Sequence, residues 1–419
     1  MSDISFDPPR GMRDFYPEDM VWRERVFGAW RTAAAAAGFQ SYDACVVESL
    51  ELLQRKSGEE VSNQIYAFQD KSGRQLALRP EMTPTLARMV AARQRQLKFP
   101  IKWTTIAQCF RYERMTRGRK REHYQWNLDI IGEERITAEM ELLSTAVAAM
   151  RKMGVQDDAW RIHVSSRKLL GELLVKLGIP AEAHATVFLA LDKLGKIPET
   201  EIAELMQDGG LTQEHTAQAL DLLRIRSLDD ATAILGDSPA LGDLRQLFEG
   251  AAIYGFEHLL QFDIAIIRGL SYYTGIVFEA FDRNRILRAI FGGGRYDNLL
   301  TAIGGAPTPA VGMGFGDVVI VELLKDLQGE SPLSTIPGVA IAYMTDAERP
   351  AAMRLAKRFR EEGRRVGLML APMKPKQFFT RVGDGSWSHA VYLGPDDVRE
   401  NRAQLKDLST RESESVPLA

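Results

Sequence analysis

Residues 124–130 alternate apolar and polar side chains with the period of a β-strand. The apolar positions are Tyr124, Trp126, Leu128 and Ile130, and the polar positions between them are Gln125, Asn127 and Asp129. Because successive side chains of a strand point to opposite faces, one face is expected to pack on a core while the other presents hydrogen-bonding groups. The pattern predicts a strand with a recognition surface on one side.

A second strand is expected just before it, near residues 109–113. There Phe110 and Tyr112 are expected on one face, with Arg111 and Glu113 on the other. The turn between the two strands is basic, with Arg114, Arg117, Arg119, Lys120 and Arg121. A basic turn is often only a solvated edge. Here polar side chains continue into both strands, which favours a ligand site beside phosphates, since guanidinium groups bind phosphate oxygens in forked pairs.

Two prolines flank Glu81, Met82 and Thr83, between a short strand and a predicted helix. The prolines restrict the backbone, so Glu81 and Thr83 are expected in a fixed turn. A carboxylate and a hydroxyl held in this way can accept hydrogen bonds from an ammonium group. A threonine N-cap with an acidic first turn explains the same residues equally well.

Residues 262–281 are predicted to form a strand, a tight bend and a second strand. Arg268 follows an apolar run, and a buried arginine is costly unless it pairs with a carboxylate or an anionic ligand. The neighbouring Tyr272 and Tyr273 are expected on opposite faces, and a buried hydroxyl there needs a partner. Further on, the glycines of residues 292–294 let the backbone approach a ligand closely or form a bulge.

Apolar spacing typical of helices runs from Val21 to Gly38 and recurs through most of residues 165–255. Residues 328–337 are rich in Gly, Ser and Pro and are typical of a linker. Beyond them, strands are predicted at 339–343, 365–370 and 389–393, and helices at 349–362 and around the basic residues 374–381. This alternation predicts a small C-terminal α/β domain.

With 419 residues, the chain has room for two or three domains. Its net charge of −3 excludes a uniformly polybasic nucleic-acid binder, so any such contact must use local patches. Two distant cysteines, Cys45 and Cys109, provide neither a disulfide framework nor a zinc-ligand cluster. The start lacks a signal core and an Arg-rich presequence, and no stretch reaches the roughly 20 apolar residues of a membrane span. We therefore expect a cytoplasmic protein.

Residues 110–129 resemble motif 2 of the class II aminoacyl-tRNA synthetases, and more narrowly that of the histidyl-tRNA synthetases. The string Arg268–Gly275 closely resembles the second histidine-specific signature of that family. Residues 81–83 resemble its amino-acid-binding element, and residues 306–320 resemble motif 3. Helix 21–38 is similar in placement to motif 1, which builds the homodimer interface in that class. The resemblance covers roughly residues 8–415, with the motifs in order.

The resemblance implies an α+β fold, with a class II catalytic domain on an antiparallel sheet, a helical insertion and a C-terminal α/β anticodon-binding domain. The catalytic core is expected to take residues 1–164 and 256–327, and the helical insertion residues 165–255. A linker at residues 328–338 then leads to the anticodon-binding domain at 339–419.

The implied reaction joins L-histidine to ATP, which gives histidyl-adenylate and pyrophosphate, and then transfers histidine to the 3′ end of tRNA(His). The resemblance makes Arg111 and Arg268 the catalytic cations. The histidine-binding residues it implies are Glu81, Met82, Thr83, Gln125, Asp129, Tyr272 and Tyr273. The implied ATP-binding residues are Arg111, Glu113, Arg119, Arg121, His123 and Arg268. Mg²⁺ is expected on the ATP phosphates, without an assigned protein ligand.

Three positions depart from the family pattern. Val319 stands where motif 3 commonly has an arginine for the terminal phosphates of ATP, so Arg119 and Arg121 are expected to contribute more to phosphate binding. His123 replaces a common phenylalanine under the adenine, and Asp129 replaces a glutamate frequent in bacterial members. These variations look like those of the plant-organelle branch.

Two other functions fit parts of the pattern. The nearest is a synthetase paralogue that acts as the regulatory subunit of ATP phosphoribosyltransferase, which Val319 alone favours. Such relatives usually lack the C-terminal module and lose the histidine signatures, and this chain keeps both. The second is a synthetase for another amino acid, such as threonine or proline, which the residues from Arg268 to Tyr273 disfavour.

Overall fold

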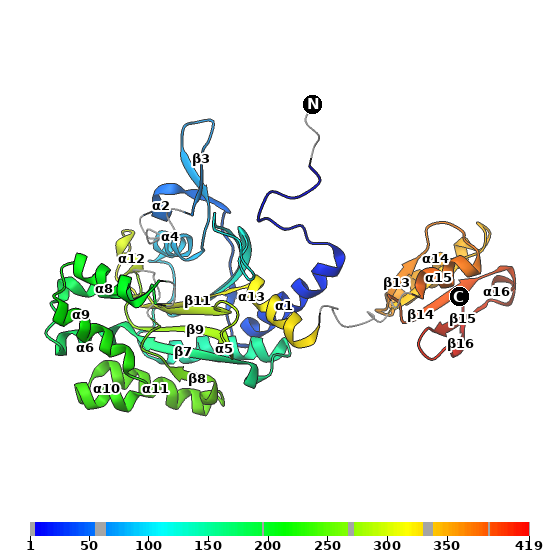
Figure 1. The fold of residues 1–419 in the computed structure, drawn as a ribbon. Coiled ribbons are helices and arrows are strands. Elements are labelled where there is room, and N and C mark those ends of the chain that lie inside the picture. Colours follow the sequence, from blue (N-terminus) through cyan, green and yellow to red (C-terminus); the bar gives the residue numbers. More distant parts are fainter. Residues whose placement is uncertain are drawn as a thin grey trace. The chain divides into compact units, whose positions relative to one another are not determined.

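The computed structural model describes residues 5–54, 64–194, 197–266, 272–329, 338–383 and 386–418. The chain forms two compact units, Met1–Ser331 and Pro332–Ala419, and each unit has its own large sheet (Figure 1). Among the residues described, no helix combines the length and the apolar character that crossing a membrane requires.

An eight-stranded sheet organises the first unit. In spatial order its strands are β1 (Gln40–Ser41), β5 (Ile101–Phe110), β6 (Glu122–Ile131), β11 (Ala310–Gly316), β10 (Phe291–Arg295), β9 (Ile276–Asp282), β7 (Trp160–Ser166) and β8 (Leu260–Phe262). The inner pairs are antiparallel, and only the outermost pairs, β1–β5 and β7–β8, are parallel. The antiparallel catalytic sheet that the sequence predicts is therefore confirmed.

The predicted hairpin is formed by β5 and β6, but its first strand begins and ends earlier in the chain than expected. The strand ends at Phe110, because the next amides leave the ladder: Tyr112 donates to the Gln64 carbonyl and Glu113 to the Arg111 carbonyl. Tyr112 consequently lies exposed outside the strand. The alternation in β6 holds, since its apolar stripe enters the main core.

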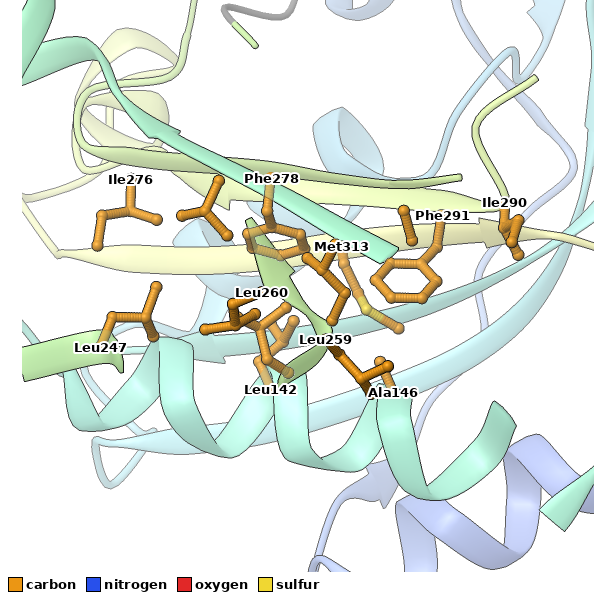
Figure 2. Close-up of a cluster of buried hydrophobic side chains, with 14 of the residues drawn as sticks. Leu142, Ala146, Leu247, Leu259, Leu260, Ile276, Phe278, Ile290, Phe291 and Met313 are labelled. Atoms are coloured by element: carbon orange, nitrogen blue, oxygen red, sulfur yellow. The ribbon is translucent and has the colours of Figure 1, made fainter. Parts of the chain in front are cut away.

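Helices cover the core face of this sheet. They are α1 (Pro17–Ala36), α5 (Thr137–Lys152), α11 (Pro239–Ile253) and α13 (Asp317–Gln328), and α5 packs against both α1 and α11. Figure 2 shows Leu142 and Ala146 of α5 beneath the sheet residues Phe278, Phe291 and Met313. Full burial of such a side chain contributes about 1.5–3 kcal/mol, so this layer fixes the strands that carry the site.

The described residues between β7 and β8 form mostly helices. The helices are α6 (Arg167–Lys176), α7 (His184–Leu191), α8 (Glu199–Asp208), α9 (Gln213–Asp221), α10 (Leu228–Leu235) and α11. Side-chain oxygens of Ser166, Thr212, Ser227 and Ser238 cap four of these helices by accepting from backbone amides. These caps satisfy amides that a helix start otherwise leaves without partners.

Smaller elements lie beyond the opposite face. A second sheet has the order β2 (Val47–Ser49), β4 (Gln75–Leu78) and β3 (Tyr66–Gln69), with α2 (Leu50–Gln54) beside it. Helices α4 (Thr83–Arg93) and α12 (Leu299–Ala302) share an apolar cluster with Ile131 and Val277 of the large sheet. Part of this face is thereby covered, and the rest is left for polar side chains.

The predicted strand from residue 262 towards Arg268 is wrong, because β8 ends at Phe262. The next residue, Asp263, forms a turn: its carboxylate accepts from the Ala265 amide, and its carbonyl accepts from the Ile266 amide. An aspartate that bonds to its own backbone two residues on favours such a turn. Arg268 itself lies outside the residues that the structure describes.

The second unit is a five-stranded α/β sheet, as the alternation of elements predicts. Its order is β13 (Arg365–Leu368), β12 (Gly338–Tyr343), β14 (His389–Leu393), β15 (Arg402–Asp407) and β16 (Ser413–Pro417), with α14 (Arg349–Glu361), α15 (Pro375–Val382) and α16 (Pro395–Glu400). The first three strands are parallel, and the last two are antiparallel. The α16–β15–β16 extension was not predicted.

Candidate active site

A cavity of about 110 Å³ lies on the face of the large sheet opposite the helical core layer. Strands β6, β10 and β11 contribute to its lining, together with the segment before α4 and the one before β9. The lining residues are Glu81, Thr83, Arg111, Gln125, Asn127, Tyr272, Tyr273, Gly292, Tyr296, Gly312, Met313 and Gly314. The cavity thus brings together most of the histidine-binding residues that the sequence predicts.

Glycines of β11 make room for the polar side chains of β6. A Cβ atom on Gly312 would lie 2.1 Å from Asp129 Oδ1, and one on Gly314 would lie 2.3 Å from Gln125 Nε2. Real Cβ contacts of this length do not occur, so any larger residue at either position must displace the neighbouring side chain. The glycines therefore determine the shape of the site.

Asp129 lies behind the cavity lining and is only 1% exposed. Its Oδ1 accepts a hydrogen bond of 2.5 Å from the Tyr296 hydroxyl, whereas its Oδ2 has no hydrogen-bond partner among the residues that the structure describes. Burial raises the pKa of the Asp129 carboxyl to about 7, and the bond from Tyr296 only partly opposes that rise. Asp129 is therefore a buried acid with a free acceptor, which suits a ligand N–H donor.

A second carboxylate, that of Glu81, lines the cavity and is 3% exposed. Tyr272 donates its hydroxyl to Glu81 Oε2 at 3.2 Å. Arg111 fixes the same turn, since its Nε donates to the Pro80 carbonyl at 2.9 Å. A carboxylate and a guanidinium thus line one small cavity, as the binding of an amino acid's ammonium and carboxylate groups requires.

Three predicted histidine-binding residues are placed differently from expectation. Met82 is fully buried in a small cluster with Ala107 and Cys109, and its side chain does not line the cavity. Tyr272 and Tyr273 do not lie on opposite faces. Both line the cavity with ring centroids 4.9 Å apart, because they precede β9 and are not part of a strand.

His123 lies next to the cavity on β6, with its Nε2 3.4 Å from Gln125 Oε1. Burial, together with the smaller effect of the nearby cations Arg111, Arg13 and Arg119, lowers the pKa of His123 to about 3. The ring is therefore neutral near pH 7, which leaves the positive field around it free for phosphates.

The arginines of the basic turn contact other side chains of the protein. Arg119 forms an ion pair with Glu113, and the Arg121 guanidinium stacks over the Tyr112 ring at 3.8 Å from its centroid. Neither residue lines the cavity. Both predicted phosphate-binding arginines are thus occupied by contacts with residues of the loop, and ATP would have to displace these contacts to bind them.

The same turn rests against α13. Arg117 pairs with Glu322 at 3.1 Å and with Asp326 at 2.5 Å. Val319, at the position of the usual motif 3 arginine, is 7% exposed and belongs to the main core, and a Cβ atom on Gly118 would lie 3.4 Å from it. Position 319 therefore contributes packing.

Arg13 lies near the site but was not assigned to it from the sequence. Its Nε donates to Glu122 Oε1 at 2.5 Å, and its Nη2 donates to Asp317 Oδ2 at 2.9 Å. Asp317 also accepts from the Tyr124 amide at 2.8 Å. Arg13 thereby joins the start of the chain to β6 and to the first turn of α13. Nothing in the pattern around Arg13 indicates partners 109 and 304 residues away.

Tyr296 and Asn127 were also not assigned from the sequence. Asn127 was recognised only as part of the polar stripe, and Tyr296 only as a neighbour of the glycine run. Asn127 lies opposite Gly314 in the pairing of β6 with β11, and Tyr296 follows the last residue of β10, so both placements depend on strands far apart in the chain. Among the described residues, no group of three or more His, Cys, Asp or Glu side chains could hold a metal ion.

Comparisons with solved structures define the class first. The histidyl-tRNA synthetase from Nostoc sp. PCC 7120 matches with a TM-score of 0.82 over 99% of this chain and 97% of that one, at 23% identity. A Bacillus halodurans C protein described as an ATP phosphoribosyltransferase regulatory subunit/histidyl-tRNA synthetase matches with a TM-score of 0.78, at 22% identity, over 93% and 99%. At these identities the likeness establishes the fold alone, which is that of the class II aminoacyl-tRNA synthetases.

Sequence comparison then identifies the family. A sequence model described as histidyl-tRNA synthetase matches residues 11–316. The chloroplastic/mitochondrial histidine–tRNA ligase of Arabidopsis thaliana is 43% identical over 99% of this chain and 86% of its own length. The chain belongs to the histidyl-tRNA synthetase family. As a member it is an aminoacyl-tRNA ligase, and the regulatory-subunit alternative has no better support.

Proposed function

We propose that this protein activates L-histidine with ATP to histidyl-adenylate and then transfers the histidine to the 3′ end of tRNA(His). The observation that carries the proposal is one small cavity lined by Glu81, Arg111 and Tyr272, with Asp129 behind it. These residues come from separated stretches of the chain, and the cavity has hydrogen-bonding groups for both ends of an amino acid.

The α-amino group of histidine is assigned to Glu81, Thr83 and Gln125, which line the cavity. The imidazole ring is assigned to Asp129, with a tyrosine hydroxyl from Tyr273 or Tyr272 at the other ring nitrogen. A polar pocket of this kind rejects ligands that leave its groups unpaired, by about 10⁴-fold. Met82 contributes by holding the turn, because its side chain is packed in the core.

The first step brings the carboxylate of histidine to the α-phosphate of ATP, and these negative groups repel each other. Arg111 lines the cavity and is assigned to neutralise their oxygens in the transition state, together with Arg268 of the undescribed segment. Glu113 is assigned to the adenine amino group, and the neutral His123 ring is assigned to stack on the base. Arg119 and Arg121 are assigned to the phosphates, after release from their partners within the loop.

Mg²⁺ is proposed to enter on the ATP phosphates. This ion usually keeps several waters and is held by substrate phosphates with few carboxylates. The absence of a cluster of metal-ligating side chains among the described residues is compatible with that mode of binding. The ion would lower the negative charge of the triphosphate, and the residues of this chain would orient the reacting groups.

Several assignments follow from the family alone. The second unit is proposed to bind the anticodon, residues 165–255 to be the insertion domain, and α1 to contribute to a homodimer interface. The cytoplasm stays a prediction, because the Arabidopsis thaliana relative is named as chloroplastic/mitochondrial.

Histidine-dependent ATP–pyrophosphate exchange by the purified protein tests the proposal. We expect exchange with histidine and not with threonine or proline, and a loss of about 10²-fold or more in Arg111→Gln. Arg151→Gln is the matched control, since Arg151 pairs with Asp157 and neither residue lines the cavity. Absence of exchange with every amino acid would favour the regulatory-subunit function, and exchange with another amino acid would exclude histidine as the substrate.

A further inference from the structure

Within the part of the chain that the structure describes, the charge around Asp129 is not balanced. Among these residues its only hydrogen-bond partner is the Tyr296 hydroxyl, and no cation pairs with it. Across the sheet, Gly312 on β11 has no side chain, and the residue opposite on β5 is Trp103. Neither of the two neighbouring strands therefore has a positively charged residue opposite Asp129.

The other titratable groups nearby do not supply one. Tyr42 packs on Trp103, and its buried hydroxyl has no hydrogen-bond partner. Arg111 lines the cavity but donates its Nε to the Pro80 carbonyl, and Glu81 is a further acid. The surroundings of Asp129 are thus tyrosines, a tryptophan and a glycine, which hydrate or neutralise a carboxylate poorly.

An ionised carboxylate in such surroundings is costly unless something pairs with it. Burial accordingly raises the pKa of Asp129 to about 7, close to the ordinary imidazole value of about 6.5. Two groups with similar pKa values that meet in a dry site share a proton and titrate as a pair. An imidazolium brings both the charge and the N–H donor that Oδ2 lacks.

We propose that the cavity binds the histidine side chain together with one proton, as an imidazolium–carboxylate pair in which Asp129 Oδ2 accepts a ring N–H. The proposal rests on the proposed function and adds the charge state of the ligand that is recognised. No bond other than the N–H bond changes, and the proton comes from solvent. Specificity then depends on the basicity of the ring as well as on its shape.

The direction of proton exchange follows from counting protons. At about pH 8 free Asp129 is ionised and free imidazole is neutral, so formation of the pair takes up one proton. At about pH 5 both free groups are protonated, so the pair releases one proton. The dissociation constant of histidine is therefore expected to be lowest near pH 7 and to rise about tenfold per pH unit above it.

Titration calorimetry of histidine binding to the full-length protein tests this directly. At about pH 8, the binding heat in buffers of different ionisation enthalpy gives the number of protons taken up. We expect close to one for histidine. For 1,2,4-triazole-3-alanine, whose ring is much less basic, we expect none and at least tenfold weaker binding. The analogue carries the same α-amino group, so the difference between the two ligands isolates the ring.

Asp129→Asn provides the matched variant, since asparagine keeps the shape and removes the charge. It should bind histidine without proton uptake; if it binds too weakly or does not fold, the wild-type pH profile and the analogue decide. Histidine binding with no proton uptake and a flat dissociation constant between about pH 7 and 8.5 would overturn the proposal. A protein that shows exchange with histidine but no proton uptake refutes only the charge state, whereas one that neither binds nor exchanges refutes the proposed function.

Discussion

Arg295 and Tyr296 are neighbours in the chain, and each of them contacts a buried carboxylate. Arg295 binds Glu139 of α5 through two hydrogen bonds of 2.6 Å, and it also donates to the Glu133 carbonyl at 3.0 Å. Tyr296 gives Asp129 a single hydrogen bond of 2.5 Å. One buried acid therefore has a bidentate counter-ion, and the other has one hydroxyl.

The difference separates a structural role from a ligand-binding one. Burial raises the pKa of Glu139, and the Arg295 pair opposes this rise, so both partners are satisfied inside the protein. Asp129 keeps an unpartnered oxygen beside a cavity, at a cost that the fold does not offset locally. Unsatisfied buried polar groups are expected where a ligand completes the site.

Loss of the carboxylate in Glu139→Gln should give the largest effect on stability. The variant removes the bidentate partner of Arg295 and leaves only its 3.3 Å pair with the more exposed Asp297, which costs about 3 kcal/mol of the free energy of unfolding. Denaturant titration measures this value. Asp157→Asn, which weakens the more exposed contacts of Asp157 with Arg151 and His258, is the control and should cost less than about 1 kcal/mol. Equal losses in the two variants would show that burial does not distinguish these pairs.

A methyl group at Gly312 is expected to displace Asp129 and to weaken the binding of histidine. Gly312→Ala would push Asp129 out of place and is expected to raise the KM for histidine by about 10²-fold, with little change in the KM for ATP. The cost in stability should be about 1–3 kcal/mol. Gly316→Ala is the matched control, because no atom lies within 4 Å of its Cβ position. Similar kinetics for both variants would contradict the packing argument.

The stability of Asp129→Asn should depend on pH differently from that of the wild type. Folded Asp129 keeps its proton up to about pH 7, whereas the unfolded residue loses it near pH 4. Wild-type stability therefore contains a contribution that is present at low pH and is lost as pH rises towards 7, by at most about 1.4 kcal/mol per unit. Thermal unfolding between pH 5 and about pH 8 should show this slope only in the wild type. A parallel slope in the variant would assign it to other groups.

The smallest effect is expected for Tyr42→Phe. The hydroxyl is buried without a partner beside Trp103, so its removal should change the free energy of unfolding by less than about 1 kcal/mol, or stabilise the protein slightly. Histidine binding should change little, since Tyr42 does not line the cavity. A marked loss of histidine affinity would place the Tyr42 hydroxyl among the ligand contacts and would contradict this prediction.

Local patterns in the sequence were sufficient for much of the fold and part of the site. The alternation in residues 124–130 predicts β6 and its polar face, and the prolines around Glu81 predict a turn that the structure places in the cavity. The tyrosine pair was mispredicted because residues 272–273 read as strand but lie before β9. Arg13 and Tyr296 could not be found, since their partners are fixed by the registers of distant strands and by α13.

The parallel pairing of β7 with β8 restricts how the intervening helices can vary. Two strands that run the same way cannot be joined by a tight turn, so the chain must travel back along the sheet before β8 begins. Helix α11 provides part of that return path and at the same time packs beside α5 in the helical layer that covers Phe278. Homologues with a shorter segment between β7 and β8 are thus expected to keep at least one helix that connects the two strands, even where the other helices of this segment are missing.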